Sequence, residues 1–411
     1  METRLKYFII LICAFLHWTA ITAKTQTSAP SFPILISYGP SPGQISEFDL
    51  YTIKSAGCTH CFIDLKNDSL NMQALSLADN LQLSLILTDD ALERYKNGED
   101  STLIAINRQT GLYTQHRSFA GYRLHNEPGL NDFPSLIDLV DYLSPTHPDL
   151  WRFIPTHPIT STPARLDTNK YDDYLALFTE TLNPSFLAVD FDQLDQTGTT
   201  FYKNISSIRA VSARTQIPFW AHVRITTYGQ NAITLQPYIR AQVYTSIAYG
   251  AKGVWYTSYR PEEAGSGSGK AMLDEEGSRT KVFTFTQKVN SELHRLSPLL
   301  SEFTSQGAYF NSADTLGRLG LAPGLPITFI DNPDIGVGFF TDPDNTTYVL
   351  IVNTNSSFGT RVTLHFQNRY SGISEIPKDS TSPQHLALSS NSPVAELLFK
   401  AGDGRLFRLQ E

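Results

Sequence analysis

The chain has 411 residues, of which 41% are hydrophobic and 11% aromatic, so it can form two ordinary domains or one large barrel with an appendage. Only 18% of the residues are charged, and no basic block interleaved with aromatic residues occurs, which argues against a nucleic-acid-binding protein. The net charge of −8 favours solubility but identifies no substrate.

The first 23 residues have the pattern of a secretory signal peptide. Arg4 and Lys6 precede an apolar run over residues 7–15, and small residues up to Ala23 offer a cleavage site. The apolar run is too short to span a bilayer comfortably, and no second segment of membrane-spanning length follows. We therefore predict a secreted or periplasmic protein without a membrane span.

Between residues 30 and 303, short apolar segments alternate with amphipathic helical segments. The predicted strands are 33–39, 58–65, 83–90, 119–127, 150–156, 186–194, 217–225 and 253–259. Helical patterns cover 45–56, 70–80, 91–97, 133–143, 171–182 and 235–250. Eight β/α units over about 270 residues predict an α/β fold of the (β/α)8 TIM-barrel type. A doubly wound sheet would require a Gly-rich phosphate-binding turn after an early strand, and the segment 38–43 is not one.

From Tyr309 onward, short strands and turns replace this alternation. The predicted strands are 335–341, 348–353, 361–366, 394–400 and 406–409, with turn sequences at 342–345 and 402–404. The sequence therefore predicts a barrel domain in residues 30–303, followed by a small all-β sandwich in residues 304–411 that packs on the barrel.

The most informative stretch is Tyr-Arg-Leu-His-Asn-Glu-Pro-Gly at residues 122–129. Polar and apolar residues alternate until the Asn-Glu-Pro turn, so Arg123, His125 and Glu127 share one face of the predicted strand. Three ionisable groups on an inward face are costly to bury, so their presence there indicates a function. Glu127 is therefore the first catalytic candidate, with a structural ion-paired carboxylate as the alternative.

Other candidates stand where the remaining strands are predicted to end, because TIM-barrel active sites lie at the C-terminal ends of the strands. They are Asp64, Asp89, Asn126, Asp190, Asp192, Trp220, His222, Arg224 and Tyr256. Strand periodicity places Asp190 and Asp192 on one face of their strand, and Trp220, His222 and Arg224 on one face of theirs. We expect these polar faces to line the barrel mouth.

A ring of carboxylates and aromatic residues suits the cleavage of glycosidic bonds in a carbohydrate substrate. One acid protonates the leaving oxygen, and a second carboxylate acts as nucleophile or base. Trp220 and Tyr256 could stack on sugar faces, with a place in the core as the alternative. His222 has no second histidine at ligand spacing, and the Cys58–Cys61 pair has no second pair at zinc spacing. We therefore predict no metal and no cofactor.

The Asn126-Glu127 pair resembles the superfamily of barrel glycoside hydrolases whose acid/base residue follows an Asn at the end of strand 4. Four further short motifs, at 121–122, 218–220, 249–253 and 401–407, look like secreted glycosidase-like proteins of polysaccharide-degrading bacteria. The resemblance covers nearly the whole mature chain. It implies that Glu127 is the general acid/base and that a nucleophilic Glu ends the seventh strand.

The seventh predicted strand, 217–225, departs from that pattern because it contains no carboxylate. Three interpretations stay open. Asp190 supplies the second carboxylate, in an inverting or an unusual retaining enzyme; or an acetamido oxygen of the substrate attacks while Asp190 orients it; or the barrel binds glycans without cleaving them. We favour an exported glycoside hydrolase with Glu127 and Asp190 as its catalytic pair. The sequence carries no signal for the sugar, the linkage or the oligomeric state.

Overall fold

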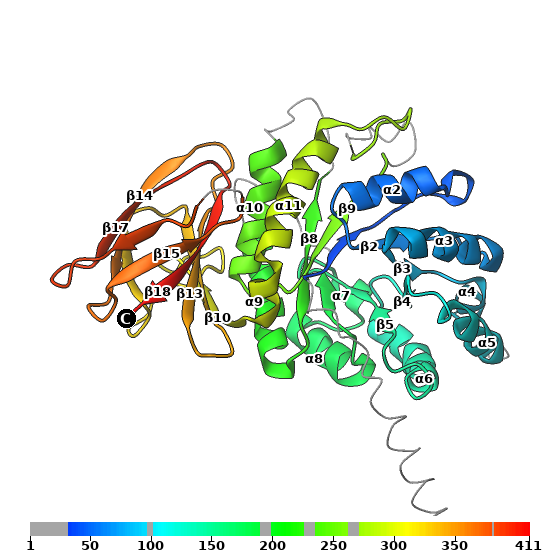
Figure 1. The fold of residues 1–411 in the computed structure, drawn as a ribbon. Coiled ribbons are helices and arrows are strands. Elements are labelled where there is room, and N and C mark those ends of the chain that lie inside the picture. Colours follow the sequence, from blue (N-terminus) through cyan, green and yellow to red (C-terminus); the bar gives the residue numbers. More distant parts are fainter. Residues whose placement is uncertain (1–31, 97–101, 190–198, 226–234, 262–270, 380–381) are drawn as a thin grey trace, which may run out of the picture. The chain divides into compact units, whose positions relative to one another are not determined.

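A computed structural model describes residues 32–96, 102–189, 199–225, 235–261, 271–379 and 382–411. All of them lie in one compact unit, Phe32–Glu411. Within that unit a parallel sheet with flanking helices precedes two antiparallel sheets along the chain (Figure 1). This is the TIM barrel with a C-terminal β-sandwich that the sequence predicts.

The parallel sheet closes on itself through a strand that is interrupted at one residue. Its strands are β1 Ile34–Ile36, β2 His60–Ile63, β3 Ser84–Leu87, β4 Phe119–Arg123, β5 Trp151–Phe153, β6 Pro155–Thr156, β7 Leu187–Val189, β8 Phe219–Arg224 and β9 Val254–Thr257. Only Ile154 separates β5, which pairs with β4, from β6, which pairs with β7. Because β1 also pairs with β9, the ring of eight strand positions is complete.

Helices connect successive strands. They are α2 Glu47–Ser55, α3 Asp68–Leu81, α4 Asp90–Lys96, α5 Leu103–Tyr113, α6 Phe133–Leu143, α7 Pro163–Leu166, α8 Tyr171–Leu182, α9 Thr199–Thr215, α10 Leu235–Ala248 and α11 Lys281–Glu302, with short 3-10 turns at Pro42–Gln44 and Leu130–Asp132. Polar side chains begin three of them by accepting a main-chain N–H of the first turn: Ser46 for α2, Asn67 for α3 and Thr280 for α11. The expected single short helix between residues 90 and 118 proves to be two helices, α4 and α5.

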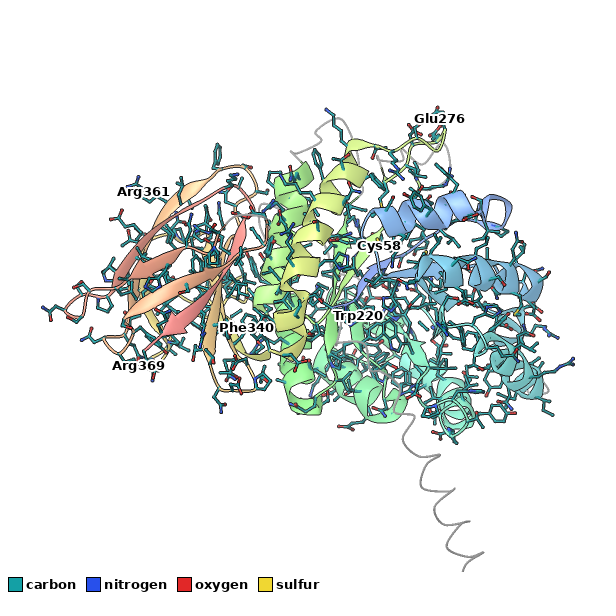
Figure 2. The ribbon with its side chains drawn as sticks, in the orientation of Figure 1. Cys58, Trp220, Glu276, Phe340, Arg361 and Arg369 are labelled. Atoms are coloured by element: carbon teal, nitrogen blue, oxygen red, sulfur yellow. The ribbon has the colours of Figure 1, made fainter. Side chains whose placement is uncertain are left out.

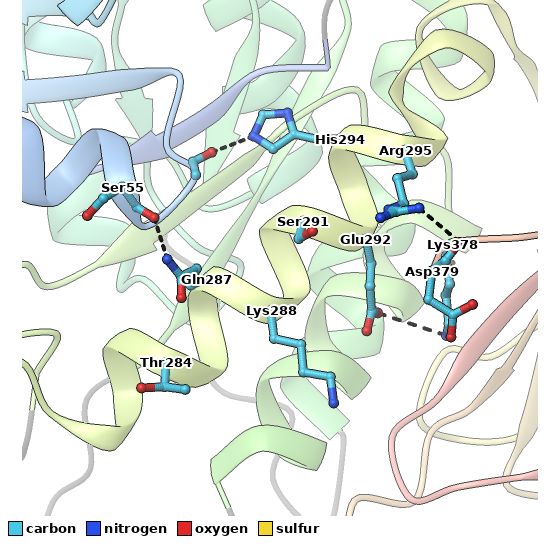
Figure 3. Close-up of a pocket in the computed structure, with 11 residues that line it drawn as sticks. Ser55, Thr284, Gln287, Lys288, Ser291, Glu292, His294, Arg295, Lys378 and Asp379 are labelled. Atoms are coloured by element: carbon cyan, nitrogen blue, oxygen red, sulfur yellow. Dashed lines mark hydrogen bonds and ion pairs between the residues drawn. The ribbon is translucent and has the colours of Figure 1, made fainter. Parts of the chain in front are cut away.

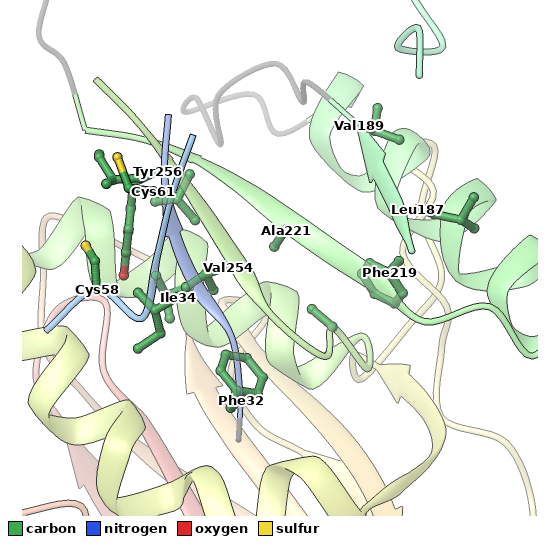
Figure 4. Close-up of a cluster of buried hydrophobic side chains, with 14 of the residues drawn as sticks. Phe32, Ile34, Cys58, Cys61, Leu187, Val189, Phe219, Ala221, Val254 and Tyr256 are labelled. Atoms are coloured by element: carbon green, nitrogen blue, oxygen red, sulfur yellow. The ribbon is translucent and has the colours of Figure 1, made fainter. Parts of the chain in front are cut away.

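Alternate strand residues fill the two sides of the barrel wall. The interior holds Leu35, Phe62, Ile86, Phe153, Phe186, Ala188, Trp220 and Trp255. Outward-facing residues pack under the helices; they include Ile34, Cys61, Leu187, Val189, Phe219, Ala221, Val254 and Tyr256 (Figure 4). Because the strand side chains are almost fully buried on both sides of the wall, the strands form short apolar runs in the sequence.

One bulge in β4 sets which residues of that strand face the interior. The pairing with β3 skips a residue between Phe119 and Gly121. Gly121 has a φ of +153°, and a Cβ at this position would lie 2.2 Å from the carbonyl oxygen of Trp151. Glycine is therefore required at the bulge. Beyond it, Tyr122 packs with the outward cluster and Arg123 lies over the ring of interior Phe62.

The C-terminal strands form two antiparallel sheets with a common core. The larger sheet contains β10 Thr304–Tyr309, β12 Ile335–Thr341, β13 Thr347–Asn353, β18 Gly404–Gln410, β15 Gly372–Ile376 and β16 His385–Ala387; the smaller contains β11 Ile327–Ile330, β14 Thr360–Phe366 and β17 Val394–Phe399. Their facing side chains, among them Val337, Ile351 and Leu364, make a separate hydrophobic cluster. Strands β10, β11, β15 and β16 were not predicted, and the domain division at residue 303 stays a prediction.

The larger antiparallel sheet packs directly on α10. This helix contacts β12, β13 and β18 on one side and β8 on the other. Phe340 of β12 stacks on Phe303 with ring centroids 5.4 Å apart, and Figure 2 shows it on the sheet near the barrel helices. At Gly404 a Cβ would come within 2.4 Å of the Tyr244 ring, so only glycine allows this close approach.

A buried network of charges joins the same elements. Arg240 of α10 donates to Glu292 of α11 at 2.9 Å and to Asp403 at 2.7 Å. Lys378, from the segment after β15, also donates to Asp403, and the Tyr244 hydroxyl donates to Glu292 at 2.7 Å. Burial acts to raise the pKa of Asp403, but Lys378 and Arg240 outweigh it and hold that pKa below its ordinary value. Two cations and two carboxylates thus compensate one another away from water.

Among the helices that the structure describes, none combines the length and the apolar composition needed to cross a bilayer.

Stability is expected to depend on pH through His60, which stacks on Trp151 inside the barrel at 4.4 Å. Burial, followed by the charge of Lys54, lowers the pKa of His60 from 6.5 to about 3. The unfolded chain therefore binds this proton more readily, so the contribution is complete above about pH 6.5 and is lost as the pH falls towards 3. One such proton changes the free energy of unfolding by up to about 1.4 kcal/mol per pH unit.

The variant His60→Phe keeps a ring on Trp151 and removes the proton-binding site. Urea denaturation between pH 4 and pH 7 should show a shallower pH dependence for this variant than for the wild type. The exposed His385→Phe is the matched control and should keep the wild-type dependence. Equal pH slopes for His60→Phe and the wild type would contradict the assignment.

Candidate active site at the barrel mouth

Among the described residues, several charged or titratable side chains lie at or just beyond the C-terminal ends of the barrel strands, and five of them concern the site. They are Asp64 after β2, Arg123 at the end of β4, Glu127 beyond it, His157 after β6 and Arg224 at the end of β8. Parallel strands of a barrel all end at the same rim, which is where TIM-barrel enzymes carry their active sites.

Glu127 is held by the main chain of the neighbouring strand. Its N–H donates to the carbonyl oxygen of Pro155 in β6 at 2.8 Å, and its φ of +50° lies in the left-handed region that few non-glycine residues adopt. Such backbone conformations persist where the surrounding structure imposes them, and they concentrate at functional sites. The predicted strand extended to Glu127, whereas β4 ends at Arg123, four residues earlier.

The Glu127 carboxylate is mostly buried and has two basic neighbours. Its side chain is 15% exposed, and its Oε2 accepts a hydrogen bond from Nη2 of Arg165 in α7 at 2.5 Å. The Nδ1 of His157 lies 3.5 Å from the same oxygen. Arg165 is itself 58% exposed, so it reaches the carboxylate from the solvent side.

His157 carries no charge at neutral pH. Its side chain is 3% exposed, and burial, assisted by the positive charge of Arg165, lowers its pKa to about 4. The Tyr171 hydroxyl donates to the His157 carbonyl oxygen at 2.9 Å and secures this segment. Arg165, rather than His157, therefore supplies the positive charge that Glu127 contacts.

Arg123 brings Asp64 and Glu127 into one electrostatic environment. Its guanidinium carbon lies 4.7 Å from the centroid of the Phe62 ring. Burial lowers the pKa of Arg123, and the negative charges of Asp64 and Glu127 are among those that oppose this change. Asp64 is exposed and accepts a hydrogen bond from the Thr88 hydroxyl at 2.5 Å.

The side chains of β8 form a ladder up the interior of the barrel. Trp220, His222 and Arg224 share the inward face, as the two-residue period predicts, while Phe219, Ala221 and Val223 pack outward. His222 is 2% exposed and shares a hydrogen bond between its Nε2 and the Thr257 hydroxyl at 2.9 Å. Arg224, at the end of the strand, is partly buried.

The expected sugar contacts of Trp220 and Tyr256 are wrong for this structure. Trp220 is 3% exposed and stacks on Phe186 with ring centroids 3.8 Å apart, because it occupies the first inward position of β8, deep in the barrel. Tyr256 is fully buried on the outward face, where its hydroxyl donates to Asn290 of α11 at 2.8 Å. Its neighbour Trp255 takes the inward position, so strand alternation turns Tyr256 towards the helices.

The remaining sequence candidates are placed only in part. Asn126 is exposed, and its carbonyl oxygen lies 3.1 Å from Nδ1 of His125. Asp89 is buried and accepts hydrogen bonds from the Ala91 N–H and the Tyr113 hydroxyl, and burial followed by the charge of Asp68 raises its pKa. Asp190 and Asp192 lie outside the described residues; β7 ends at Val189, immediately before Asp190 in the chain.

Two residues of this site were missed by the sequence analysis. His157 directly follows the predicted strand 150–156, so the strand-end rule applied to the fifth strand would have found it. Arg165 has no such signal. It lies 38 residues after Glu127 in a short helix, and only the fold brings the two side chains together.

A concave region lies away from the mouth, beside α11 (Figure 3). This groove has a volume of about 630 Å³ and is bordered by the end of α2, one side of α11 and residues 378–379. His294 contacts the Gly57 carbonyl oxygen at 2.8 Å, and Arg295 donates to the Asp379 carbonyl oxygen at 3.0 Å. None of the sequence-predicted site residues lines it.

Within the described ranges, no group of three or more His, Cys, Asp or Glu side chains is arranged to hold a metal ion.

No protein-family model matches the chain, and no curated protein sequence matches it. Solved structures do. A GH27 β-L-arabinopyranosidase from Geobacillus stearothermophilus matches 93% of this chain and 97% of its own, with 8% identity and a TM-score of 0.53. A variant of that enzyme in complex with arabinose matches 93% and 98%, with 8% identity and a TM-score of 0.50.

A β-galactosidase from the Antarctic haloarchaeon Halorubrum lacusprofundi matches 64% of this chain with 12% identity and a TM-score of 0.48. The chain spans 58% of that enzyme's length. The likeness to the arabinopyranosidase is one of fold. It extends over the barrel and the antiparallel sheets together, since 93% of this chain is included.

Replacing Arg165 should change the titration of His157. In Arg165→Gln the pKa of His157 should rise from about 4 towards 6.5, because the nearby positive charge is gone while the burial remains. NMR titration of the His157 ring protons measures this directly. Lys170→Gln, an exposed cation of the following segment, is the control and should leave the titration unchanged. An unaltered His157 titration in Arg165→Gln would contradict the described contact.

Proposed function

We propose that the protein is an exported glycoside hydrolase that cleaves O-glycosidic bonds of an oligo- or polysaccharide. Glu127 is its general acid/base and Asp190 its second carboxylate. The observation that carries the proposal is the place of Glu127: a mostly buried carboxylate beyond the fourth strand of a barrel that shares its fold with a glycosidase. The Asn126-Glu127-Pro128 sequence supports it independently of the fold.

The chemistry requires one group that holds a proton near the leaving oxygen. Glu127 is constrained at its main chain by Pro155, so its carboxylate has a defined position at the rim. In the first step this carboxyl group protonates the glycosidic oxygen, and the departing sugar leaves as an alcohol. The second carboxylate either attacks the anomeric carbon or removes a proton from the attacking water.

Arg165 has to be accommodated in this scheme, because an arginine in contact favours the carboxylate form of Glu127. The contact therefore describes the base form, which exists before a proton is taken up and again after it is donated. Arg165 is 58% exposed on a four-residue helix, so it can leave the carboxylate with little loss of packing. We propose that a bound glycan displaces it.

The identity of the second carboxylate rests on sequence order. Strand β8, where the resembled superfamily carries its nucleophile, has the sequence Phe-Trp-Ala-His-Val-Arg and no acid. Asp190 follows β7 directly and is the nearest acid after that strand in the chain. The lack of an acid on β8 also supports the alternative of an inactive barrel that binds glycans.

Glu127→Gln should lower kcat on a cleaved glycan by roughly 10²- to 10⁴-fold, the usual contribution of general acid–base catalysis. The measurement is chromatography of products from a broad panel of oligo- and polysaccharides, incubated with wild type and variant. Glu276→Gln, which replaces an exposed glutamate, is the matched control and should keep wild-type turnover. Unchanged turnover by Glu127→Gln would refute its role.

The same assay separates the open mechanisms. Asp190→Asn should also abolish turnover, and the anomeric form of the first product distinguishes inversion from retention. If wild type binds glycans but releases no product, the binding-only alternative replaces the hydrolase.

Export is proposed from the N-terminal 23 residues, whose charged and apolar segments have the order of a signal peptide. Expression of the chain with residues 1–23 in a secreting host should yield a protein that begins close to Lys24, measured by intact mass of the extracytoplasmic fraction. Replacing Ile9, Ile10 and Leu11 by Asp should keep the chain uncleaved in the cytoplasm. A full-length, uncleaved wild-type protein would contradict the proposal.

A further inference from the structure

We propose that the glycan bound at the mouth carries an anionic substituent, a carboxylate or a sulfate ester, and that Arg123 binds it. This inference rests on the proposed function, because it assumes a carbohydrate at the barrel mouth. It names the class of substrate and assigns Arg123 a role in specificity.

Arg123 is a mostly buried cation that no anion among the described residues contacts. Its guanidinium carbon lies 4.7 Å from the centroid of the Phe62 ring, and in the described part of the chain no carboxylate forms an ion pair with the guanidinium. The pKa of Arg123 is lowered because burial disfavours its charge. A buried charge without a counter-ion in contact is costly, so a ligand that supplies the counter-charge would gain a strong interaction.

The carboxylates of Asp64, Glu93 and Glu127 act on Arg123 electrostatically, and each contacts another group. The Glu93 carboxylate lies 3.9 Å from Nζ of Lys66. The Asp64 carboxylate accepts a hydrogen bond from Thr88, and the Glu127 carboxylate accepts one from Arg165. All three act on Arg123 without reaching contact distance. The positive charge of Arg123 is therefore compensated only in part by the described residues.

The shape of the group also favours an anion with two or more oxygens. A guanidinium is planar and presents paired N–H donors that match the oxygens of a carboxylate or a sulfate. Phe62 belongs to the interior of the barrel, and its ring lies against the Arg123 guanidinium. Arg165, which is largely exposed beside Glu127, adds a second cation at the mouth.

The test uses glycans that differ only in the anionic group. Oligogalacturonides are compared with their carboxyl-reduced forms, and sulfated galactan oligosaccharides with their desulfated forms, by calorimetric binding and by product release from the full chain. Wild type should prefer one anionic form over its neutral counterpart by about tenfold or more. The pair that shows the preference identifies carboxylate or sulfate as the group recognised.

In Arg123→Gln the preference should fall by about tenfold or more, as expected for the loss of a hydrogen-bonded charge, while Arg123→Lys should keep part of it. Arg214→Gln, an exposed arginine at the end of α9, is the matched control and should keep the full preference. Circular dichroism melting of each variant checks that it is folded, and the Lys variant serves if Arg123→Gln does not fold.

The outcomes separate this inference from the function on which it rests. Glu127-dependent cleavage of neutral glycans without any preference for the anionic forms would refute the role of Arg123 and leave the hydrolase intact. An anionic preference that Arg123→Gln and Arg123→Lys both retain in full would refute it as well. Absence of binding and cleavage across both glycan pairs and the broad panel would refute the function and the inference together.

Discussion

The closed ring of parallel strands is the constraint on which the rest of the molecule depends. Closure is achieved by the segment Trp151–Thr156, which pairs with β4 before Ile154 and with β7 after it. Once the ring is closed, every strand residue must face either the interior or the helices. The same segment supplies the Pro155 carbonyl oxygen that fixes the main chain of Glu127. The same segment therefore closes the barrel and positions the main chain of the candidate acid.

The interior is filled in layers that change from aromatic to charged along the strands. Strand β8 shows the sequence of layers: Trp220 is stacked among other rings, His222 contacts Thr257, and Arg224 ends the strand. A packed aromatic floor excludes water from below, so the charged groups can be hydrated or bound by ligand from the mouth alone. This gradient explains why Arg123 and Glu127 are mostly buried although they stand at the end of the barrel where TIM-barrel enzymes bind their substrates.

The antiparallel sheets support the barrel from outside rather than from the mouth. Arg240, Glu292, Lys378 and Asp403 compensate one another in the interface, and Gly404 allows the sheet to approach Tyr244 closely. Removing one member of such a network leaves a buried charge without a partner. This destabilises the fold more than replacing the whole network by hydrophobic residues does. The network thus fixes α10 and α11, which in turn pack over the outward residues of β8 and β9. The sandwich thus helps to hold strand β8, which carries Trp220, His222 and Arg224, in a fixed position.

The sequence by itself determined the eight barrel strands, most of the helices, and the place of Glu127 and Arg123 near a strand end, because periodicity and turn residues are local properties. Helices α6 and α8 match their predicted limits for this reason. Only the tertiary structure decided that Tyr256 faces the helices, because this depends on which face of β9 closes inward. It also decided that Trp220 lies deep in the barrel, because this depends on the position of Trp220 along β8. The contacts of Glu127 with Arg165 and His157, and the lack of an ion-pair partner for Arg123 in the described residues, follow from segments far apart in the chain. No local sequence pattern predicts which side chains from such distant segments come into contact.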